Sequence, residues 1–258
     1  MIDYSARLHT RIFVTRKEMG EAAADDFERI AKKLLAEQDE INIVFAAAVS
    51  QSDFFAALAK KDLPWSRMQA WHMDEYLGLP PTAPQCFGNF LRDAIFERVN
   101  FKKVNYINDM TGTPEEVAAA YSAAYNSRPI DIVCMGIGEN AHIAFNDPGE
   151  ADFHDPETVK VVNLDDKCRQ QQVNDGAFPT FDDVPKQALT LTVPALARAK
   201  YHLCMVPAPS KAQAVADTLL GPITDMVPAT VLRLLPNAAL YLDRDSAALF
   251  LEKIRPQV

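Results

Sequence analysis

Short, strongly apolar runs alternate along this chain with longer segments whose apolar residues recur at helical spacing. The runs at 41–48 and 201–206 are apolar almost throughout, whereas the segment 16–38 carries apolar residues every three or four positions. Short runs of this kind are typical of strands buried on both faces, and their alternation with helices indicates βαβ units. The sequence therefore predicts an α/β fold with a mostly parallel sheet.

The same pattern assigns elements along the whole chain. Strands are predicted at 11–14, 41–48, 68–73, 103–106, 130–135, 159–164, 189–193, 201–206 and 238–242. Helices are predicted at 16–38, 87–99, 114–125, 210–219, 228–234 and 246–254, and a further helical segment follows residues 50–53 and ends at residue 60. Thr113 is the expected N-cap of the helix that begins at Pro114. The segment 169–176 is polar and Gln-rich. No repeat, low-complexity tract or linker-like change in composition interrupts the chain, so we predict one domain, 1–258.

Composition excludes several classes of partner. The formal net charge of −9 disfavours nonspecific binding to nucleic acid or to an anionic membrane, and an anionic small substrate would need a local positive site. No apolar run reaches membrane-spanning length, and the N-terminus at 1–4 does not resemble a signal peptide. The four cysteines lack C-x-x-C spacing, which favours buried thiols in a reducing compartment. We expect a cytoplasmic protein, and the five scattered histidines suggest no metal site.

One strand end carries many polar groups at short spacing. The apolar run to Met135 breaks at Gly136 and Gly138, which permit a tight turn and close backbone approach to a ligand. Asn140, His142 and Asp147 follow, with Glu139 and Asn146 between them. Histidine is the usual proton shuttle near neutral pH, but a strand-to-helix turn needs no function to contain such residues. Ala141 replaces the third glycine of a dinucleotide fingerprint, so that reading is excluded.

Three further strand ends place polar residues where parallel strands share an edge. These residues are Ser50, Gln51 and Ser52, then Asp74 and Glu75, and finally Lys211. A lysine near a helix start is disfavoured by the helix dipole unless an anion neutralises it. The two serines could instead be plain helix caps and Lys211 a solvated surface residue. Adjacent strand residues point to opposite faces, so at most one of the two carboxylates faces a shared pocket.

Three segments together resemble the glucosamine-6-phosphate deaminase (isomerase) family, whose superfamily includes 6-phosphogluconolactonases. They are Met-Asp-Glu-Tyr-Leu-Gly-Leu-Pro at 73–80, Gly-Ile-Gly leading to His-Ile-Ala-Phe-Asn at 136–146, and Val-Pro-Lys-Gln-Ala-Leu-Thr at 184–190, and Ser-Lys-Ala at 210–212 agrees with them. The resemblance implies a Rossmann-like open, mostly parallel sheet with helices on both faces. It also implies ring opening of an amino-sugar phosphate, proton transfer between C2 and C1 and loss of ammonia, without metal or organic cofactor.

The resemblance assigns roles to individual residues. His142 matches the ring-opening histidine, Asp74 matches the base, and Asp147 stands where the family has a glutamate that orients the imidazole. Substrate or phosphate contacts are expected from Ser50, Gln51, Ser52, Glu75, Gly136, Gly138, Arg169 and Lys211. The expected partner is a small-molecule sugar phosphate, and assembly into a homo-oligomer stays open.

The chain also departs from the family pattern. Asn140-Ala141-His142 replaces the usual Asp-Gly-His, and Ala-Ala-Ala-Val-Ser-Gln at 46–51 replaces a Gly-rich phosphate loop. The family's substrate-contacting arginine falls near Asn174, offset from Arg169. These departures leave two alternatives open: a catalytically weakened sugar-phosphate-binding protein, and a 6-phosphogluconolactonase-like hydrolase that uses His142 as base.

Overall fold

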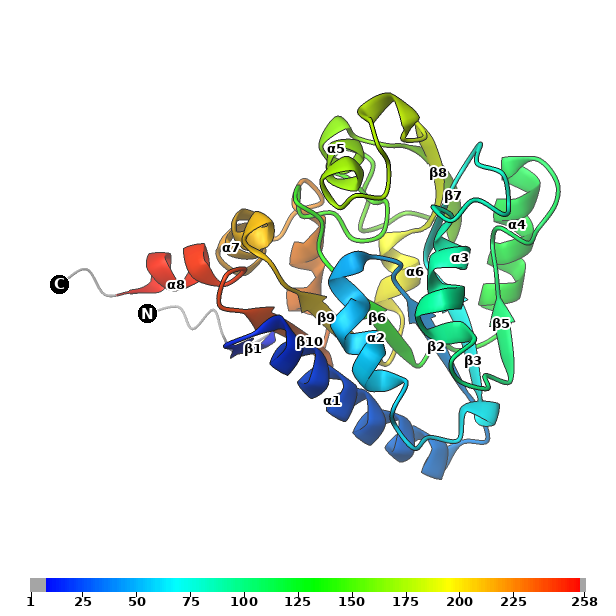
Figure 1. The fold of residues 1–258 in the computed structure, drawn as a ribbon, viewed down its shortest axis with the longest axis horizontal. Helices are drawn as coiled ribbons and strands as arrows, with labels where there is room; N and C mark the ends of the chain where they lie inside the picture. Colours follow the sequence, from blue (N-terminus) through cyan, green and yellow to red (C-terminus); the bar gives the residue numbers. More distant parts are fainter. Residues whose placement is uncertain (1–7, 256–258) are drawn as a thin grey trace.

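A computed structural model describes residues 8–255 and places seven strands in one parallel sheet of order β1-β10-β9-β6-β2-β3-β5 (Figure 1). Its strands are β1 (His9–Phe13), β2 (Ile41–Phe45), β3 (Met68–His72), β5 (Lys103–Asn105), β6 (Ile132–Met135), β9 (Tyr201–Val206) and β10 (Ala238–Asp243). A smaller antiparallel sheet has the order β4-β8-β7, with β4 (Asp74–Tyr76), β7 (Val159–Asn163) and β8 (Gln187–Leu191).

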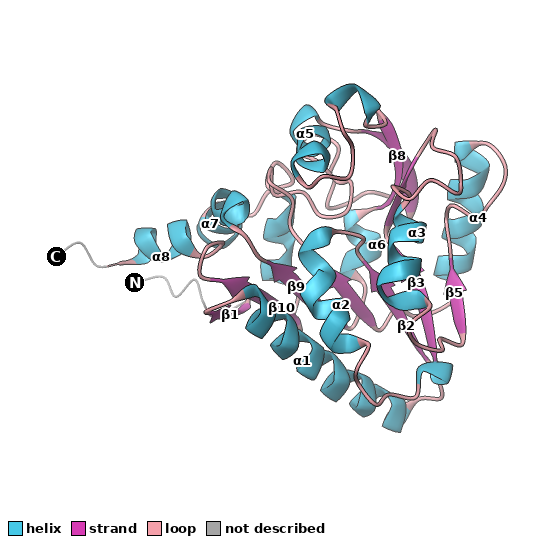
Figure 2. Cartoon of the chain, in the orientation of Figure 1, coloured by secondary structure: helices cyan, strands magenta, loops and turns pink. Residues whose placement is uncertain are grey.

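Helices cover both faces of the large sheet (Figures 1 and 2). The α-helices of the described residues are α1 (Arg16–Glu37), α2 (Ser52–Leu58), α3 (Phe87–Leu91), α4 (Pro114–Asn126), α5 (Asp166–Asn174), α6 (Val193–Ala197), α7 (Ala212–Leu220) and α8 (Ala248–Ile254). Ile43 and Phe45 of β2 belong to a core with α1 and α2, whereas Val44 belongs to a second core with α4, α6 and α7. Both faces of β2 are therefore buried, and the predicted Rossmann-like α/β architecture is confirmed.

Two helix starts show how local sequence fixes the element boundaries. Thr15 accepts a hydrogen bond from the N–H of Glu18, whose carboxylate accepts from Thr15 in return, and Thr113 and Glu116 form the same reciprocal pair before α4. Such capping boxes satisfy backbone donors that the first helical turn leaves without partners. The predicted N-cap at Thr113 is confirmed.

Several predicted elements differ from those observed. The polar segment 169–176 lies largely in α5, the predicted helix at 228–234 is a 3₁₀ helix, and the predicted helix 87–99 is α3 followed by a π-helical stretch at Arg92–Phe96. After β3 the chain bends at Met73 and enters the small sheet as β4, which pairs antiparallel to β8. Met73 spans the two sheets, because its N–H donates to the Phe45 carbonyl and its own carbonyl accepts from Leu191.

The strand order reverses direction between β2 and β6. From β2 the chain builds outward through β3 and β5, then returns to β6 on the other side of β2 and continues to β9 and β10. Open α/β sheets bind their ligands at such a switch point, outside the carboxyl ends of the strands. Because β9, β6, β2 and β3 are neighbours, the residues that follow them share one edge of the sheet.

Two expectations from composition can be compared with the described residues. None of the helices in residues 8–255 is long and apolar enough to cross a membrane. All four cysteines are buried free thiols, as predicted. The segment 1–4, on which the expectation of no signal peptide rests, lies outside the described residues.

Candidate active site

A cavity of about 60 Å³ lies at the carboxyl ends of β9, β6, β2 and β3. Six residues singled out from the sequence line it: Ser50, Asp74, Gly136, Gly138, His142 and Lys211. The remaining lining residues are Ala46, Ala47, Ala48, Met73, Phe87, Ile137, Ala144, Phe145, Gln171 and Gln172. The topology thus brings a carboxyl group, an imidazole and an ammonium group from three separate strand ends to one cavity.

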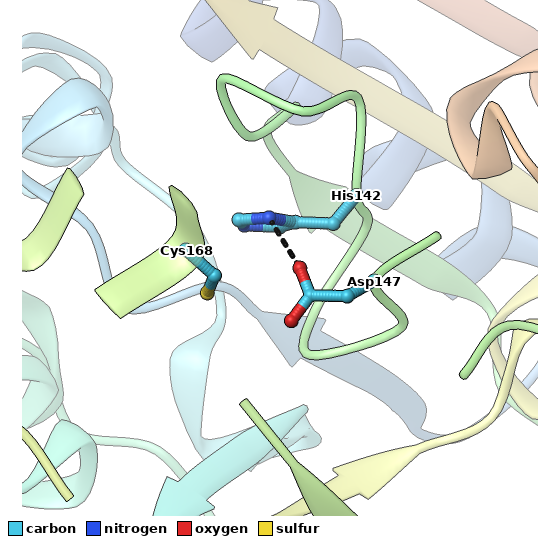
Figure 3. A group of neighbouring side chains, drawn as sticks. All are labelled: His142, Asp147 and Cys168. Atoms are coloured by element: carbon cyan, nitrogen blue, oxygen red, sulfur yellow. Dashed lines mark ion pairs between the residues drawn. The ribbon is translucent and has the colours of Figure 1, made fainter. Parts of the chain in front are cut away.

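Asp147 and Asn140 orient the His142 ring. Figure 3 shows the ring with Asp147. His142 Nδ1 lies 3.0 Å from Asp147 Oδ1 and 2.7 Å from Asn140 Oδ1, while Asn140 Nδ2 donates to Asp147 Oδ1 at 2.9 Å. Because both oxygens accept, Nδ1 carries the ring proton and Nε2 is left as the acceptor. No described residue bonds Nε2, so the ring can take a proton from a group in the cavity.

Asp147 is held as a carboxylate. Burial alone would raise its pKa, but hydrogen bonds and charge from His142, with further hydrogen bonds from Asn140 and the Asp165 N–H, hold the pKa of Asp147 below its ordinary value. The side chain of Asp147 is shorter than the glutamate that the family has at this position, but its Oδ1 still reaches within 3.0 Å of His142 Nδ1. An ionised carboxylate at this position also stabilises the imidazolium that forms when the ring accepts a proton.

Cys168 on α5 completes a cluster with this pair. Its Sγ, a nitrogen of His142 and an oxygen of Asp147 lie within 4.8 Å of one another (Figure 3), and thiol, imidazole and carboxylate are all donors that zinc accepts. Hydrogen bonds already engage both oxygens of Asp147 and Nδ1 of His142. These hydrogen bonds account for the approach of His142 to Asp147, whereas the Cys168 thiol only lies beside the pair. The scattered histidines in the sequence did not indicate this cluster.

In the loop after β6, two alanines rather than the two glycines have the positive φ that is usual for glycine. Gly136 and Gly138 do not have positive φ, whereas Ala141 and Ala144 do, at 66° and 49°. A Cβ on Gly138 would lie 2.1 Å from Cε1 of His142, and one on Gly136 would lie 3.1 Å from Nε2 of Gln51. Gly138 is thus needed because the His142 ring packs directly over its backbone, whereas a side chain at Gly136 would require the Gln51 amide to shift by a few tenths of an ångström.

Asp74 and Glu75 face opposite ways, as adjacent strand residues must. Asp74 lines the cavity, and its buried Oδ1 has no hydrogen-bond partner among the described residues. Burial, and secondarily the charge of Glu75, raises the pKa of Asp74 well above its usual value. Burial therefore favours the neutral form of Asp74, and a cationic group bound beside it would favour the ionised form.

Glu75 has a different role from the substrate contact expected from the sequence. Its carboxylate accepts from the N–H groups of Tyr76, Phe87 and Gly88, each at 2.9 Å, and so caps α3. Burial raises the pKa of Glu75 to about 7 against the lowering effect of these three donors. Glu75 does not line the central cavity but a separate one of about 260 Å³ on the far side of β4.

Lys211 is a buried cation without an anionic partner. It is 5% exposed, and no carboxylate of the described residues lies within ion-pair distance of its Nζ. Burial lowers the pKa of Lys211, against the weaker effects of Asp175 and Glu139. An uncompensated buried charge is costly, so this site favours an anionic ligand.

Three other predicted contact residues do not line the central cavity. Gln51 is fully buried and donates to the Met205 carbonyl at 3.0 Å and to Ser50 Oγ at 3.2 Å, which positions Ser50. Ser52 is exposed at the start of α2. Arg169 donates to the carbonyls of Phe181 and Val184 and stacks on the Phe181 ring, so it holds the turn after α5.

Gln171 and Gln172 line the cavity but were not singled out from the sequence. Gln171 Oε1 accepts from the N–H of Glu139 at 2.9 Å, which ties α5 to the loop after β6. The Gln-rich composition of 169–176 was the available signal. Both glutamines also line an adjoining, mainly apolar cavity of about 220 Å³, together with Ala47, Ala48 and Phe87, and the central cavity can therefore extend outward.

Comparisons with known proteins find similarity over most of the chain. The family model described as Glucosamine-6-phosphate isomerases/6-phosphogluconolactonase matches residues 14–239. Glucosamine-6-phosphate deaminases of Bacillus thuringiensis (strain Al Hakam) and Bacillus cereus (strain B4264) are each 30% identical over 240 residues, which make up 93% of this chain and 88% of those proteins.

Solved structures show the same fold. A monomeric glucosamine-6-phosphate deaminase has a TM-score of 0.86 and 26% identity, over 94% of this chain and all of that one. The 6-phosphogluconolactonase of Trypanosoma brucei has a TM-score of 0.76 and 18% identity, over 96% of this chain and 99% of that one, and this more distant likeness shows the fold alone. Because the family model matches most of its length, the chain belongs to the glucosamine-6-phosphate isomerase/6-phosphogluconolactonase family.

Proposed function

We propose that this protein is an enzyme that converts glucosamine 6-phosphate, or a close amino-sugar phosphate, into a ketose 6-phosphate and ammonia. The observation that carries the proposal is the shared cavity of Asp74 and His142, with the His142 ring oriented by Asp147. The relatives named glucosamine-6-phosphate deaminase support this substrate class.

His142 would open the sugar ring. Its free Nε2 takes the proton of the anomeric hydroxyl and delivers a proton to the ring oxygen, which yields the open-chain aldehyde. The Nδ1–H bond to Asp147 fixes the ring and stabilises the transient imidazolium. One imidazole thus supplies both proton transfers of this step.

Asp74 would move a proton between two carbons of the open chain. The ammonium group on C2 favours ionisation of Asp74 when substrate binds, and the carboxylate then takes the C2 proton and returns a proton to C1. One ammonium proton passes to the C1 carbonyl oxygen, which leaves a hydroxyl on C1 and an iminium at C2. Water adds to this iminium, ammonia leaves, and the product is the ketose 6-phosphate. Lys211, with the Ser50 hydroxyl, would bind the phosphate.

A sugar-phosphate-binding protein with weak catalysis is the second candidate. The raised pKa of Asp74 favours it, because a neutral carboxylic acid is a poor base unless the substrate ionises it. In that case the protein would bind the phosphate through Lys211 and turn over slowly.

A substrate panel separates these functions. Ammonia and the ketose 6-phosphate would be measured with glucosamine 6-phosphate, which yields fructose 6-phosphate, and with galactosamine 6-phosphate, which yields tagatose 6-phosphate. N-acetylglucosamine 6-phosphate, whose nitrogen is acylated, serves as the control that releases no ammonia, and 6-phosphogluconolactone tests lactone hydrolysis. Our proposal requires ammonia and ketose phosphate in equal amounts from an amino-sugar phosphate. Binding by calorimetry without turnover favours the second candidate, and hydrolysis of the lactone alone contradicts both.

A further inference from the structure

His72 is the last residue of β3, stands two positions before Asp74 in the chain, and is fully buried. Its Nδ1 lies 2.9 Å from the backbone carbonyl oxygen of Asp74, and its Nε2 lies 2.8 Å from the backbone nitrogen of Ile107. A carbonyl can only accept and an amide N–H can only donate, so the ring is neutral with its proton on Nδ1. Both ring nitrogens are therefore used by the backbone.

The backbone of His72 is held as firmly as its ring. The Tyr121 hydroxyl on α4 donates to the His72 carbonyl at 2.8 Å and accepts from the His72 N–H at 3.2 Å. Ile107, which follows β5, supplies the donor on the other side of the ring. The imidazole thus projects from a fixed position and links the end of β3 and the segment after β5 to the carbonyl of Asp74.

This carbonyl lies where the chain changes sheets. His72 still pairs with Phe45 in the parallel sheet, whereas Asp74 already pairs with Thr190 in the antiparallel sheet. The direction of the Asp74 side chain depends on how the chain turns between them at Met73. A hydrogen bond from the His72 ring across the turn, from residue i to residue i+2, fixes that turn.

We propose that His72 is a positioning residue for Asp74, whose Nδ1–H holds the sheet-to-sheet turn so that the Asp74 carboxyl faces the cavity. This inference rests on the proposed function, in which Asp74 is the base. His72 itself is shielded from the cavity and touches no reacting group. Nothing in the sequence indicates this role, because a histidine at the end of a buried strand is more often a core residue whose hydrogen bonds are satisfied.

Two matched variants separate positioning from general support. In His72→Asn, the amide nitrogen takes the place of Nδ1 and can still donate to the Asp74 carbonyl, but the Ile107 N–H loses its acceptor. In His72→Gln, the amide oxygen takes the place of Nε2 and can still accept from Ile107, but the Asp74 carbonyl loses its donor. Each variant gives up one buried hydrogen bond, so comparable losses of stability are expected.

The measurement is kcat, KM and deuterium exchange at C2 for the folded parent and both variants, with crystal structures of the variants. We expect His72→Gln to lose roughly tenfold to a hundredfold in kcat and exchange, with KM nearly unchanged, because small misplacements of a catalytic group have effects of this size. His72→Asn should stay within a few-fold of the parent. Equal losses in both variants would overturn the inference.

The crystal structures decide the inference even if the parent turns over no amino-sugar phosphate, which would refute the proposed function separately. A displaced Asp74 in His72→Gln, together with an unmoved Asp74 in His72→Asn, supports the positioning role. An unmoved Asp74 in both variants overturns it.

Discussion

Asn140 stands between the two ionisable residues of the site. Its Oδ1 lies 2.7 Å from His142 Nδ1 and its Nδ2 donates to Asp147, so the amide bridges imidazole and carboxylate without adding charge. The family's aspartate at this position would face Asp147 directly. With asparagine at this position, the repulsion between two adjacent carboxylates is avoided. Asp147 is then the one carboxylate of the described residues that accepts from the ring.

Asn140→Asp is expected to move the acid limb of kcat/KM to higher pH. A second carboxylate beside Nδ1 favours the imidazolium, and His142 must begin neutral to accept a proton. The measurement is a pH profile of kcat/KM for the parent, for this variant and for Asn140→Ala, which removes the amide without adding charge. If the limb of Asn140→Asp coincides with that of Asn140→Ala, charge beside His142 does not set it.

Lys211→Ala is expected to weaken sugar-phosphate binding at least roughly tenfold, which equals about 1.4 kcal/mol. The loss follows because Lys211 is a buried cation of the cavity with no carboxylate partner among the described residues. Isothermal titration with glucosamine 6-phosphate measures it. Lys103→Ala, on the exposed edge strand β5, removes the same charge away from the cavity and should leave the affinity unchanged. Equal affinities in parent and Lys211→Ala would rule out the phosphate assignment.

At the level of elements, the turn from β9 to the helix bearing Lys211 contains the most strained residue of the described backbone. Ala208 has φ +87° and ψ 148°, a conformation that only glycine adopts readily. Its N–H donates to the Asp243 carboxylate at 3.0 Å, which ties the turn to the end of β10. The chain therefore reaches Lys211 through a strained peptide.

Ala208→Gly is expected to raise the free energy of unfolding by about 1 kcal/mol. Relief of backbone strain contributes roughly 1–3 kcal/mol, and the greater freedom of glycine in the unfolded chain offsets roughly 0.5–1 kcal/mol of it. Ala120→Gly, at an exposed position inside α4, should instead lower stability by about 1 kcal/mol. Urea denaturation compares the two, and a destabilised Ala208→Gly would show that the turn is not strained.

The sequence was sufficient for the elements that depend on local pattern. Buried runs and helical spacing gave the strands of the large sheet and their helices, and the shared carboxyl edge followed from the parallel order. It was insufficient at 74–76, because the switch into an antiparallel sheet depends on β8, more than a hundred residues away in the chain. Periodicity alone could not reveal that pairing.

Prediction of the site failed where a residue's role depends on its neighbours. The expected ligand contacts at Glu75 and Arg169 are occupied by backbone groups of α3 and of the turn after α5. Gln51 supports Ser50 instead of facing the cavity. Each of these three residues is separated by only a few positions along the chain from a residue that lines the cavity. Only the packed structure shows which way its side chain points.

At the scale of the whole molecule, burial of His72 makes the free energy of unfolding depend on pH. Burial lowers the pKa of His72 to about 4, against the weaker effect of its bond to the Asp74 carbonyl, whereas an unfolded histidine titrates near 6.5. The folded state therefore favours neutral His72. This contribution to stability is fully present above pH 6.5 and is lost as the pH falls from about 6.5 to 4.

The stability difference between parent and His72→Asn should therefore shrink by roughly 3 kcal/mol between pH 6.5 and 4. The raised pKa of Glu75 and the lowered pKa of Asp147 act in both proteins, so their effects cancel in this comparison. Urea denaturation at a series of pH values measures the difference. A difference that does not vary with pH would show that His72 titrates normally in the folded protein.

The catalytic account depends on proton abstraction by Asp74. Its most direct test is turnover of glucosamine 6-phosphate in D₂O, followed by NMR of the C2 and C1 positions for the parent and for Asp74→Asn. We expect the parent to release ammonia and form fructose 6-phosphate with deuterium at C1. Asp74→Asn should slow both exchange and turnover by roughly a hundredfold or more, as expected for loss of a general base, while still binding the sugar phosphate. Exchange at the parent rate in Asp74→Asn would contradict the account.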